Sequence, residues 1–401
     1  MRPAWVEVET KAITENVQSI RKFVGEKTGV IAVVKADGYG HGLIPSAKAV
    51  LEGGATMLAV AIPEEVKALH NADVYCPTLI MGCSLPCQAE EIVHLDSAAV
   101  INCLKSGQAF SDAAVKIGKP FRAHIKVNTG MGRVGVRWSE AAEMIRKVAA
   151  MPGIEIEGIM THFATADYDD QTSLHTQFDR FCTILDNVAK HGITPRYRHC
   201  ANSAAVTFFP PSHLDMVRPG LIMYGITPVP MASDIPPETG MPALYTPTKR
   251  VNYARERTED TRDRFIPFPL RPALSLKSQV VQVNNLPAGD AVGYGLTYRT
   301  HRDSKFALLP LGYADGLARM HSNTGWALIH NERALIAGRV SMDQTIIDVT
   351  DIPDVMVGDT AVLIGSQGDK TITAWEVGMA MGSIAYEALV SLGVRLPRLY
   401  I

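Results

Sequence analysis

The 401-residue sequence lacks several features that would point away from a soluble enzyme. No stretch approaches the roughly 20 consecutive apolar residues of a membrane-spanning helix. Residues 1–9 lack the apolar core of a secretory signal peptide. The 39 basic and 41 acidic residues nearly cancel, which gives no electrostatic reason to expect nucleic acid or an anionic membrane as a partner. We therefore expect a cytoplasmic protein that acts on a small molecule.

Cysteine is also scarce, with six residues scattered along a long chain. Cys83 and Cys87 are close together, but no second pair stands at the spacing of zinc ligands. No metal site is predicted. Reduced thiols, as in a cytoplasmic enzyme, are the preferred interpretation over disulfides.

Short apolar runs alternate with helical patterns over the first 225 residues, which is typical of βα units. The eight expected strands cover residues 30–34, 57–61, 78–81, 98–102, 123–127, 156–161, 197–200 and 216–224. The clearest helical patterns cover residues 139–150 and 172–191. Eight repeats predict an α/β fold with an N-terminal (β/α)8 TIM barrel, whose functional groups gather at the C-terminal ends of the strands. An open, doubly wound sheet is the alternative.

The second half of the chain follows a different pattern. Residues 227–270 are rich in proline and mixed charge, which is typical of an insertion or linker, and no catalytic role is assigned to them. From residue 271 onward, strand patterns bounded by turn signals predominate, beginning with a long strand over 274–283. A helical pattern covers 374–392, and a closing strand is expected over 394–401. The prediction is a barrel over 1–226, an insertion over 227–270 and a mainly β domain over 271–401.

Lys35 is the most informative residue, because it ends the apolar run of residues 29–34. A lysine at the end of a buried strand is partly withdrawn from water, which lowers its pKa and frees a nucleophilic amine. Glycines at 38, 40 and 42 allow the backbone to turn tightly and approach a ligand. Such an amine suits a Schiff base with an aldehyde cofactor. In isolation, a solvated loop lysine is the ordinary alternative.

Nine sequence blocks, taken together and in order, resemble the alanine racemase family. They cover residues 34–42, 128–133, 161–164, 201–204, 218–220, 293–295, 312–316, 338–343 and 386–387. The resemblance implies pyridoxal 5′-phosphate as cofactor, interconversion of L- and D-alanine, and supply of D-alanine for peptidoglycan. It also implies a head-to-tail homodimer in which the second domain of the partner completes each active site.

The resemblance assigns two catalytic bases, one for each face of the substrate. Lys35 carries the cofactor and takes the proton from D-alanine, whereas Tyr294, from the partner subunit, takes the proton from L-alanine. A free phenol has a pKa near 10, so a tyrosine base needs nearby positive charge or hydrogen bonds. Read alone, Tyr294 between two glycines could be a strand aromatic beside a bulge.

The other matched residues are assigned by resemblance to the cofactor, the substrate or support. The cofactor set comprises Tyr39, His162, Asn202, Ser203, Arg218, Gly220, Leu221 and Tyr386. The substrate set comprises Arg133, Met342 and Tyr313, and the supporting set comprises Lys126, His199 and Asp343. Lys126 matches a lysine that is carbamylated in many relatives, where the carbamate holds the arginine. The plain interpretations are a helix N-cap for Ser203, a surface arginine in a turn for Arg218 and satisfied core histidines for His162 and His199.

The sequence departs from the family pattern at Asn128, Ser341 and Ser383, where Asp, Cys and Thr are common. Tyr386 is retained, which favours alanine over serine as substrate. Alternatives are a racemase of serine or of broader specificity, a decarboxylase of basic amino acids with the same domain plan, and a non-catalytic cofactor carrier. Arg218 argues against the decarboxylase, which normally has an acid there, and the second domain argues against the carrier, which resembles the barrel alone.

Overall fold

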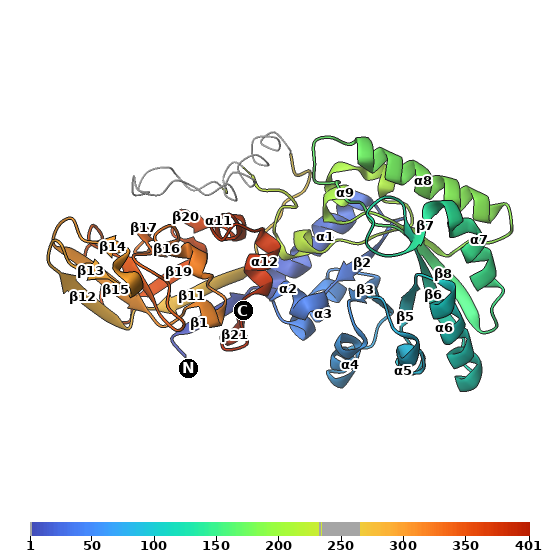
Figure 1. The fold of residues 1–401 in the computed structure, drawn as a ribbon, viewed down its shortest axis with the longest axis horizontal. Coiled ribbons are helices and arrows are strands. Elements are labelled where there is room, and N and C mark those ends of the chain that lie inside the picture. Colours follow the sequence, from blue (N-terminus) through green and yellow to red (C-terminus); the bar gives the residue numbers. More distant parts are fainter. Residues whose placement is uncertain (1, 232–233, 235–264) are drawn as a thin grey trace.

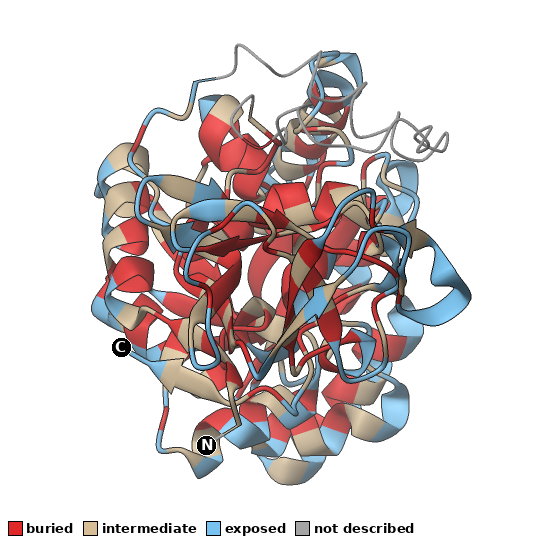
Figure 2. Cartoon of the chain, turned by 90° about the vertical axis from the view of Figure 1, so that its left-hand side faces the viewer, coloured by how far each residue is buried: buried red, intermediate tan, exposed pale blue. Residues whose placement is uncertain are grey.

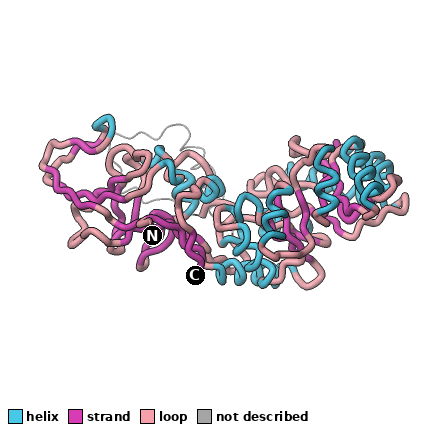
Figure 3. The backbone as a smooth tube through the Cα atoms, turned by 90° about the horizontal axis from the view of Figure 1, so that it is seen from below, coloured by secondary structure: helices cyan, strands magenta, loops and turns pink. Residues whose placement is uncertain are grey.

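The computed structural model describes residues 2–231, 234 and 265–401. The chain forms two lobes along one axis, a helix-covered barrel and a strand-rich lobe (Figures 1 and 3). Most of the predicted insertion over 227–270 lies outside the described residues. Buried residues gather in the interior of the molecule, whereas exposed residues lie at its periphery (Figure 2). In the described part, no helix combines the length and apolar character needed to cross a bilayer.

The first lobe is the predicted barrel. Its parallel strands are β2 (Gly29–Val33), β3 (Met57–Val60), β4 (Thr78–Ile80), β5 (Ala98–Ile101), β6 (Phe121–Asn128), β8 (Ile154–Met160), β9 (Tyr197–His199) and β10 (Met216–Val217). They follow the order β10-β2-β3-β4-β5-β6-β8-β9, and β7 (Val136–Arg137) adds to β6. The ends meet where Asp215 N donates to Arg198 O (3.2 Å) and Arg218 N to Ala201 O (2.8 Å). The fold class is thereby confirmed in favour of the barrel over the open sheet.

Helices cover the outside of this ring (Figure 1). They are α1 (Thr10–Val24), α3 (Leu43–Glu52), α4 (Pro63–Asn71), α5 (Ala89–His94), α6 (Leu104–Ile117), α7 (Trp138–Ala149), α8 (Thr172–Ala189) and α9 (Ser203–Phe208). The side chain of Asn202 caps α9 by accepting from Ala205 N at 3.0 Å. Asn202, not Ser203, is therefore the N-cap of this helix.

Alternation of side chains along the strands decides what faces the barrel interior. Along β2, Ile31 and Val33 belong to a cluster inside the ring, whereas Val30 and Ala32 pack outward in the main core. The same alternation along β6 sends Phe121, Ala123, Ile125 and Val127 outward. His124 and Lys126 consequently project inward, and Lys35 continues the inward series of β2.

The segment directly after β2, α2 (Lys35–Tyr39), turns in the left-handed sense. Ala36, Asp37 and Tyr39 have φ of 53°, 53° and 54°, and Gly38 and Gly40 also have positive φ. A left-handed conformation costs a non-glycine residue roughly 1–2 kcal/mol, so neighbouring contacts must hold this turn. Gly40 permits close packing, because a Cβ there would lie 2.3 Å from the carbonyl oxygen of Leu389.

The second lobe is mainly β, as predicted. Its strands are β11 (Leu274–Gln279), β12 (Gln282–Leu286), β13 (Ala291–Val292), β14 (Tyr298–Arg299), β15 (Ser304–Leu309), β16 (Trp326–Ile329), β17 (Glu332–Leu335), β18 (Thr345–Asp348), β19 (Thr360–Gln367), β20 (Lys370–Ile372) and β21 (Arg398–Tyr400). One sheet has the order β17-β16-β19-β11-β1-β21, and another has the order β12-β15-β18. Strand β1 (Ala4–Val8) thus joins this lobe although it precedes the barrel, pairing with both β11 and β21.

Four expected elements differ from the structure. The closing strand expected over 394–401 is shorter, since β21 covers only Arg398–Tyr400. The strand expected over 216–224 stops at Val217, and residues Leu221–Tyr224 form a 3₁₀ turn after Pro219 and Gly220. The helix expected over 374–392 is two helices, α11 (Ala374–Ala380) and α12 (Ala385–Val390), separated at Gly382, which has φ of 74°. The long strand expected over 274–283 is divided between β11 and β12. All six cysteines are unpaired.

Candidate active site

A cavity of about 590 Å³ opens at the C-terminal ends of the barrel strands. Ten predicted site residues line it: Lys35, Tyr39, Lys126, Arg133, His162, Asn202, Ser203, Arg218, Gly220 and Tyr386. Nine of them come from the barrel lobe, whereas Tyr386 comes from α12, which packs against α2. The size suits a small cofactor together with a small substrate. Within the described residues, no group of three or more His, Cys, Asp or Glu side chains could hold a metal ion.

The electrostatic surroundings of Lys35 favour its neutral amine. Burial is the main cause that lowers the pKa of Lys35, and the positive charge of Arg133 lowers it further. The carboxylate of Glu65 opposes these two effects. A lysine so placed can lose its proton more readily than an exposed one, which a nucleophile or base requires.

Lys126 projects from β6 into the same cavity and is buried. Burial, followed by the charges of Arg218 and Arg133, holds its pKa well below the usual range. The loop after β6 leads to Arg133 and is organised by Asn128, whose Oδ1 accepts from Gly130 N (3.2 Å) and Gly132 N (3.0 Å). Asn128 therefore keeps the hydrogen-bond acceptor that an aspartate would offer there, without its charge.

Arg218 ends a buried chain of hydrogen bonds. Its Nη1 lies 2.8 Å from Nδ1 of His199, Nε2 of His199 lies 2.8 Å from Nδ1 of His124, and Nε2 of His124 lies 3.0 Å from Oε2 of Glu157. Because arginine can only donate, Nδ1 of His199 must accept, and each histidine then donates through Nε2. Only the neutral Nε2–H form of both rings satisfies every contact in the chain.

The protonation preferences of these groups agree with that arrangement. Burial is the first cause that lowers the pKa of both His199 and His124. Burial also lowers the pKa of Arg218 to about 10, which still leaves it charged near neutral pH. Its Nη2 is held by Thr161 O (2.7 Å) and Cys200 O (3.2 Å) and lies 3.3 Å from Nδ1 of His162. Among the described residues, the hydrogen-bond partners of this guanidinium are thus all neutral groups.

A second wall of the cavity is made of hydroxyl and backbone donors. Ser203 is buried, and its Oγ accepts from Gly220 N at 2.9 Å. A Cβ on Gly220 would lie 2.6 Å from Oη of Tyr39, so a larger residue would close this part of the site. Burial raises the pKa of Tyr39 to about 12, which keeps its hydroxyl protonated as a donor. The ring centroids of Tyr39 and Tyr386 lie 6.1 Å apart.

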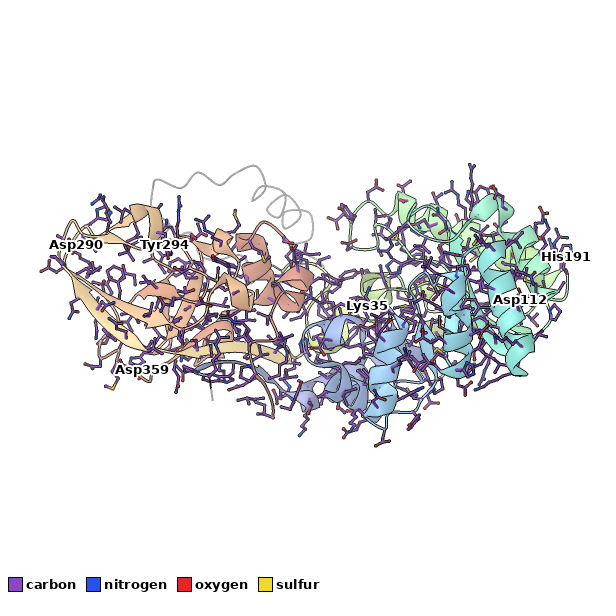
Figure 4. The ribbon with its side chains drawn as sticks, turned by 60° about the horizontal axis from the view of Figure 1, so that its bottom comes forward. Lys35, Asp112, His191, Asp290, Tyr294 and Asp359 are labelled. Carbon is purple, nitrogen blue, oxygen red and sulfur yellow. The ribbon has the colours of Figure 1, made fainter. Side chains whose placement is uncertain are left out.

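Four predicted residues of the second lobe do not line the cavity of their own chain. Tyr294, Tyr313 and Met342 are 71%, 42% and 53% exposed, and the exposed Asp343 pairs with Arg395 at 2.6 Å. Tyr294 and Lys35 lie in different lobes (Figure 4). The loops bearing Tyr313 and Met342 are neighbours, since Tyr313 N donates to Ser341 O and Ala314 N to Met342 O, both at 3.0 Å. Leu221 is fully buried behind the cavity wall, and His199 lies behind Arg218.

Some residues of the site were not foreseen. Glu65 accepts a hydrogen bond from the backbone of Ala36, the residue after Lys35. His124 contacts His199, and Glu157 contacts His124. Cys83 lines the cavity. His124 could have been found, because it shares the inward face of a strand with Lys126. The sequence carries no comparable signal for Glu65, whose position depends on how two loops meet.

Comparisons with known proteins agree with this geometry. The family model of the alanine racemase N-terminal domain matches residues 8–228, and that of the C-terminal domain matches residues 273–400. An alanine racemase from Halothermothrix orenii is 39% identical over 399 residues, which span all of this chain and 97% of that protein. The crystal structure of an alanine racemase from E. faecalis superposes with a TM-score of 0.86 at 32% identity, covering all of this chain and 98% of the other. A histidine racemase from Leuconostoc mesenteroides superposes with a TM-score of 0.83 at 27% identity, covering 100% and 98%.

Proposed function

The chain belongs to the alanine racemase family, and we propose that it interconverts L- and D-alanine with pyridoxal 5′-phosphate held on Lys35. The observation that carries this proposal is that one cavity contains Lys35, whose pKa is lowered, the buried Arg218 and several hydroxyl groups. D-Alanine made in this way would serve peptidoglycan synthesis.

The residues present fit this cofactor. Tyr39, Ser203, Tyr386 and the backbone amides of Gly220 and Leu221 would hold its phosphate, because hydroxyl and N–H donors beside a glycine suit an oxyanion. Asn202 and His162 would line the cofactor. The narrow space at Gly220, where a Cβ would meet the Tyr39 hydroxyl, supports the idea of a pocket shaped for a bound group. When bound, the cofactor supplies an electron sink that makes the substrate Cα–H acidic.

Arg218 would face the ring nitrogen of that cofactor. A guanidinium can only donate, so it cannot keep the nitrogen protonated as a carboxylate would. Its hydrogen-bond partners are neutral, and no ion pair within the described residues compensates its positive charge. By leaving that nitrogen unprotonated, Arg218 would disfavour side reactions and favour the return of a proton to Cα.

Two residues of the chain would move the proton. Nζ of Lys35 would remove it from D-alanine, and Oη of Tyr294 would remove it from L-alanine, each returning a proton on its own face. Two bases on opposite faces invert the centre without turning the substrate. Arg133 would bind the substrate carboxylate, with the Met342 backbone and Tyr313 completing the grip. Asp343 would support that loop.

This scheme needs a second copy of the chain. We propose a head-to-tail homodimer, because Tyr294, Tyr313 and Met342 are exposed and do not line the cavity of their own chain. The barrel of a partner subunit placed against them would cover these three side chains and bring Tyr294 to the partner's cavity. The domain division into 1–226, 227–270 and 271–401 also remains a proposal.

Carbamylation of Lys126 is proposed as well. A depressed pKa supplies the neutral amine with which carbon dioxide reacts, and the resulting anion would lie between Arg133 and Arg218. The carbamate would hold Arg133 in the orientation that binds a carboxylate.

The direct test is to incubate the purified protein and pyridoxal 5′-phosphate with L-alanine in deuterated water. Formation of D-alanine carrying α-deuterium supports the proposal, whereas an amine product would indicate decarboxylation. Binding of the cofactor without either product would indicate a carrier. The likeness to a histidine racemase favours one further comparison, with L-serine and L-histidine as substrates in the same assay.

A further inference from the structure

The carboxylate of Glu65 joins the two loops that follow strands β2 and β3. Its Oε1 accepts from Ala36 N at 2.6 Å, and its Oε2 accepts from Ala61 N at 2.7 Å. Ala36 directly follows Lys35, and Ala61 directly follows β3, the strand beside β2 in the barrel. Each carboxylate oxygen therefore accepts a hydrogen bond from a backbone N–H group. Such hydrogen bonds to an ionised group are shorter and stronger than neutral ones.

The loop that Glu65 holds has an unusual backbone. Ala36, Asp37 and Tyr39 all lie in the left-handed region, where non-glycine residues persist only if their surroundings impose it. Other contacts hold the later part of the turn. Asp37 Oδ1 accepts from Leu43 N (2.7 Å), and Arg398 Nε donates to Gly40 O (3.1 Å). The bond from Ala36 N to Glu65 anchors the first left-handed residue, one bond from the Lys35 backbone.

Glu65 also acts on Lys35 through its charge. It raises the pKa of Lys35, against the effects of burial and Arg133. Glu64, one residue earlier on α4, is exposed and forms no hydrogen bond to either loop within the described residues. The two adjacent glutamates thus share charge and helix but differ in their contact with the turn.

We propose that Glu65 is a positioning residue for Lys35, whose carboxylate fixes the left-handed turn from which the lysine side chain enters the cavity. The inference rests on the proposed function, since it is for the reactions of Lys35 that this placement matters. The amide of a glutamine at this position could accept from one N–H but would present its own NH2 group to the other. Glu65→Gln therefore breaks one anchor with little change in side-chain size.

The test compares Glu65→Gln with the matched control Glu64→Gln in the full-length protein stripped of cofactor. The first readout is hydrogen–deuterium exchange of peptides covering residues 34–43. The second is the rate at which pyridoxal 5′-phosphate is captured by Lys35, trapped by borohydride and located by mass spectrometry. The third is the pH midpoint for acetylation of Lys35 by acetic anhydride.

The variants leave the other ionisable side chains of the cavity unchanged: Tyr39, Cys83, Lys126, Arg133, His162, Asp167, Arg218 and Tyr386.

We expect faster exchange in the 34–43 peptides, a lower pH midpoint for Lys35 and capture slowed by about tenfold, the size of effect that loss of one hydrogen bond to a charged group produces. Glu65→Asp keeps the charge but shortens the side chain. Compared with Glu65→Gln, it should bring the pH midpoint of Lys35 closer to the wild-type value than it brings the capture rate. Equal behaviour of Glu65→Gln and Glu64→Gln in all three readouts would overturn the inference. Failure of the wild-type protein to capture the cofactor on Lys35 would instead overturn the proposed function.

Discussion

Nη1 of Arg218 donates a hydrogen bond of 2.8 Å to Nδ1 of His199, and this contact links the cavity to a carboxylate deep in the barrel. Beyond His199 the chain passes through His124 to Glu157. Since arginine cannot accept a hydrogen bond, it dictates the tautomer of both rings. The position of the guanidinium therefore depends on side chains that never reach the cavity.

The first prediction concerns His199. In His199→Leu, Nη1 of Arg218 loses its buried acceptor, and leaving such a donor unpaired costs about 1–3 kcal/mol. We expect the racemisation rate at saturating cofactor to fall by roughly tenfold to a hundredfold. His191→Ala, at an exposed position in the turn that follows α8, is the control (Figure 4). Activity of His199→Leu equal to that of the control would mean that the chain does not position Arg218.

The second prediction concerns Lys126. Replacing it with alanine removes the proposed anion beside Arg133, so kcat/KM for alanine should fall by an amount on the order of tenfold. Added acetate should restore part of the loss by placing a carboxylate in the vacated space. The control variant Lys48→Ala, at an exposed position of α3, should keep its kcat/KM and should not be affected by acetate. Full activity of Lys126→Ala without acetate would remove the carbamate from the account.

The third prediction uses the buried His41, which follows the left-handed turn. Its Nδ1 lies 3.0 Å from Tyr39 O and 3.1 Å from Gly38 O. Its buried Nε2 has no hydrogen-bond partner among the residues that the structure describes. Burial lowers the pKa of His41 to about 4. The unfolded chain, with a histidine pKa near 6.5, binds more protons between those values, so this residue's contribution to stability is complete above about pH 6.5 and declines as the pH falls.

That effect can be measured by urea unfolding. Between about pH 7.5 and about pH 5, His41 should contribute a loss of about 2 kcal/mol in the free energy of unfolding. The variant His41→Asn keeps a donor for the two carbonyls. Over the same pH interval, its free energy of unfolding should fall by about 2 kcal/mol less than that of the wild type. His321, whose pKa burial also lowers to about 4, remains in both proteins and cancels in the comparison. An identical pH dependence of the two proteins would contradict the assignment.

Much of the fold follows from local patterns in the sequence. The apolar run before Lys35 and the alternation along residues 121–128 are enough to predict buried strands and their inward faces. The barrel and the β lobe are confirmed. Of the residues predicted for the site, ten line the cavity. Nine of these follow or end strands of the barrel and meet there because the C-terminal ends of parallel strands converge.

The parts that were missed depend on contacts distant in sequence. Strand β1 joins a sheet formed by residues more than 260 positions later, as Val6 pairs with Leu276, and no local pattern in residues 4–8 shows that partner. The strand expected to continue to residue 224 ends early because Pro219 lacks an N–H and Gly220 turns the chain. Glu65 was missed because its role depends on the meeting of two loops.

The central claim is that Lys35 and Tyr294 act in one site but come from different subunits. It is tested by mixing two inactive variants, Lys35→Ala and Tyr294→Phe, under conditions that allow subunits to exchange. Random pairing makes half of the dimers mixed, and each mixed dimer has one site with both bases intact, so about one quarter of wild-type activity should return. If both bases belonged to the same chain, no mixed dimer would hold an intact site, and the mixture would stay as inactive as its components.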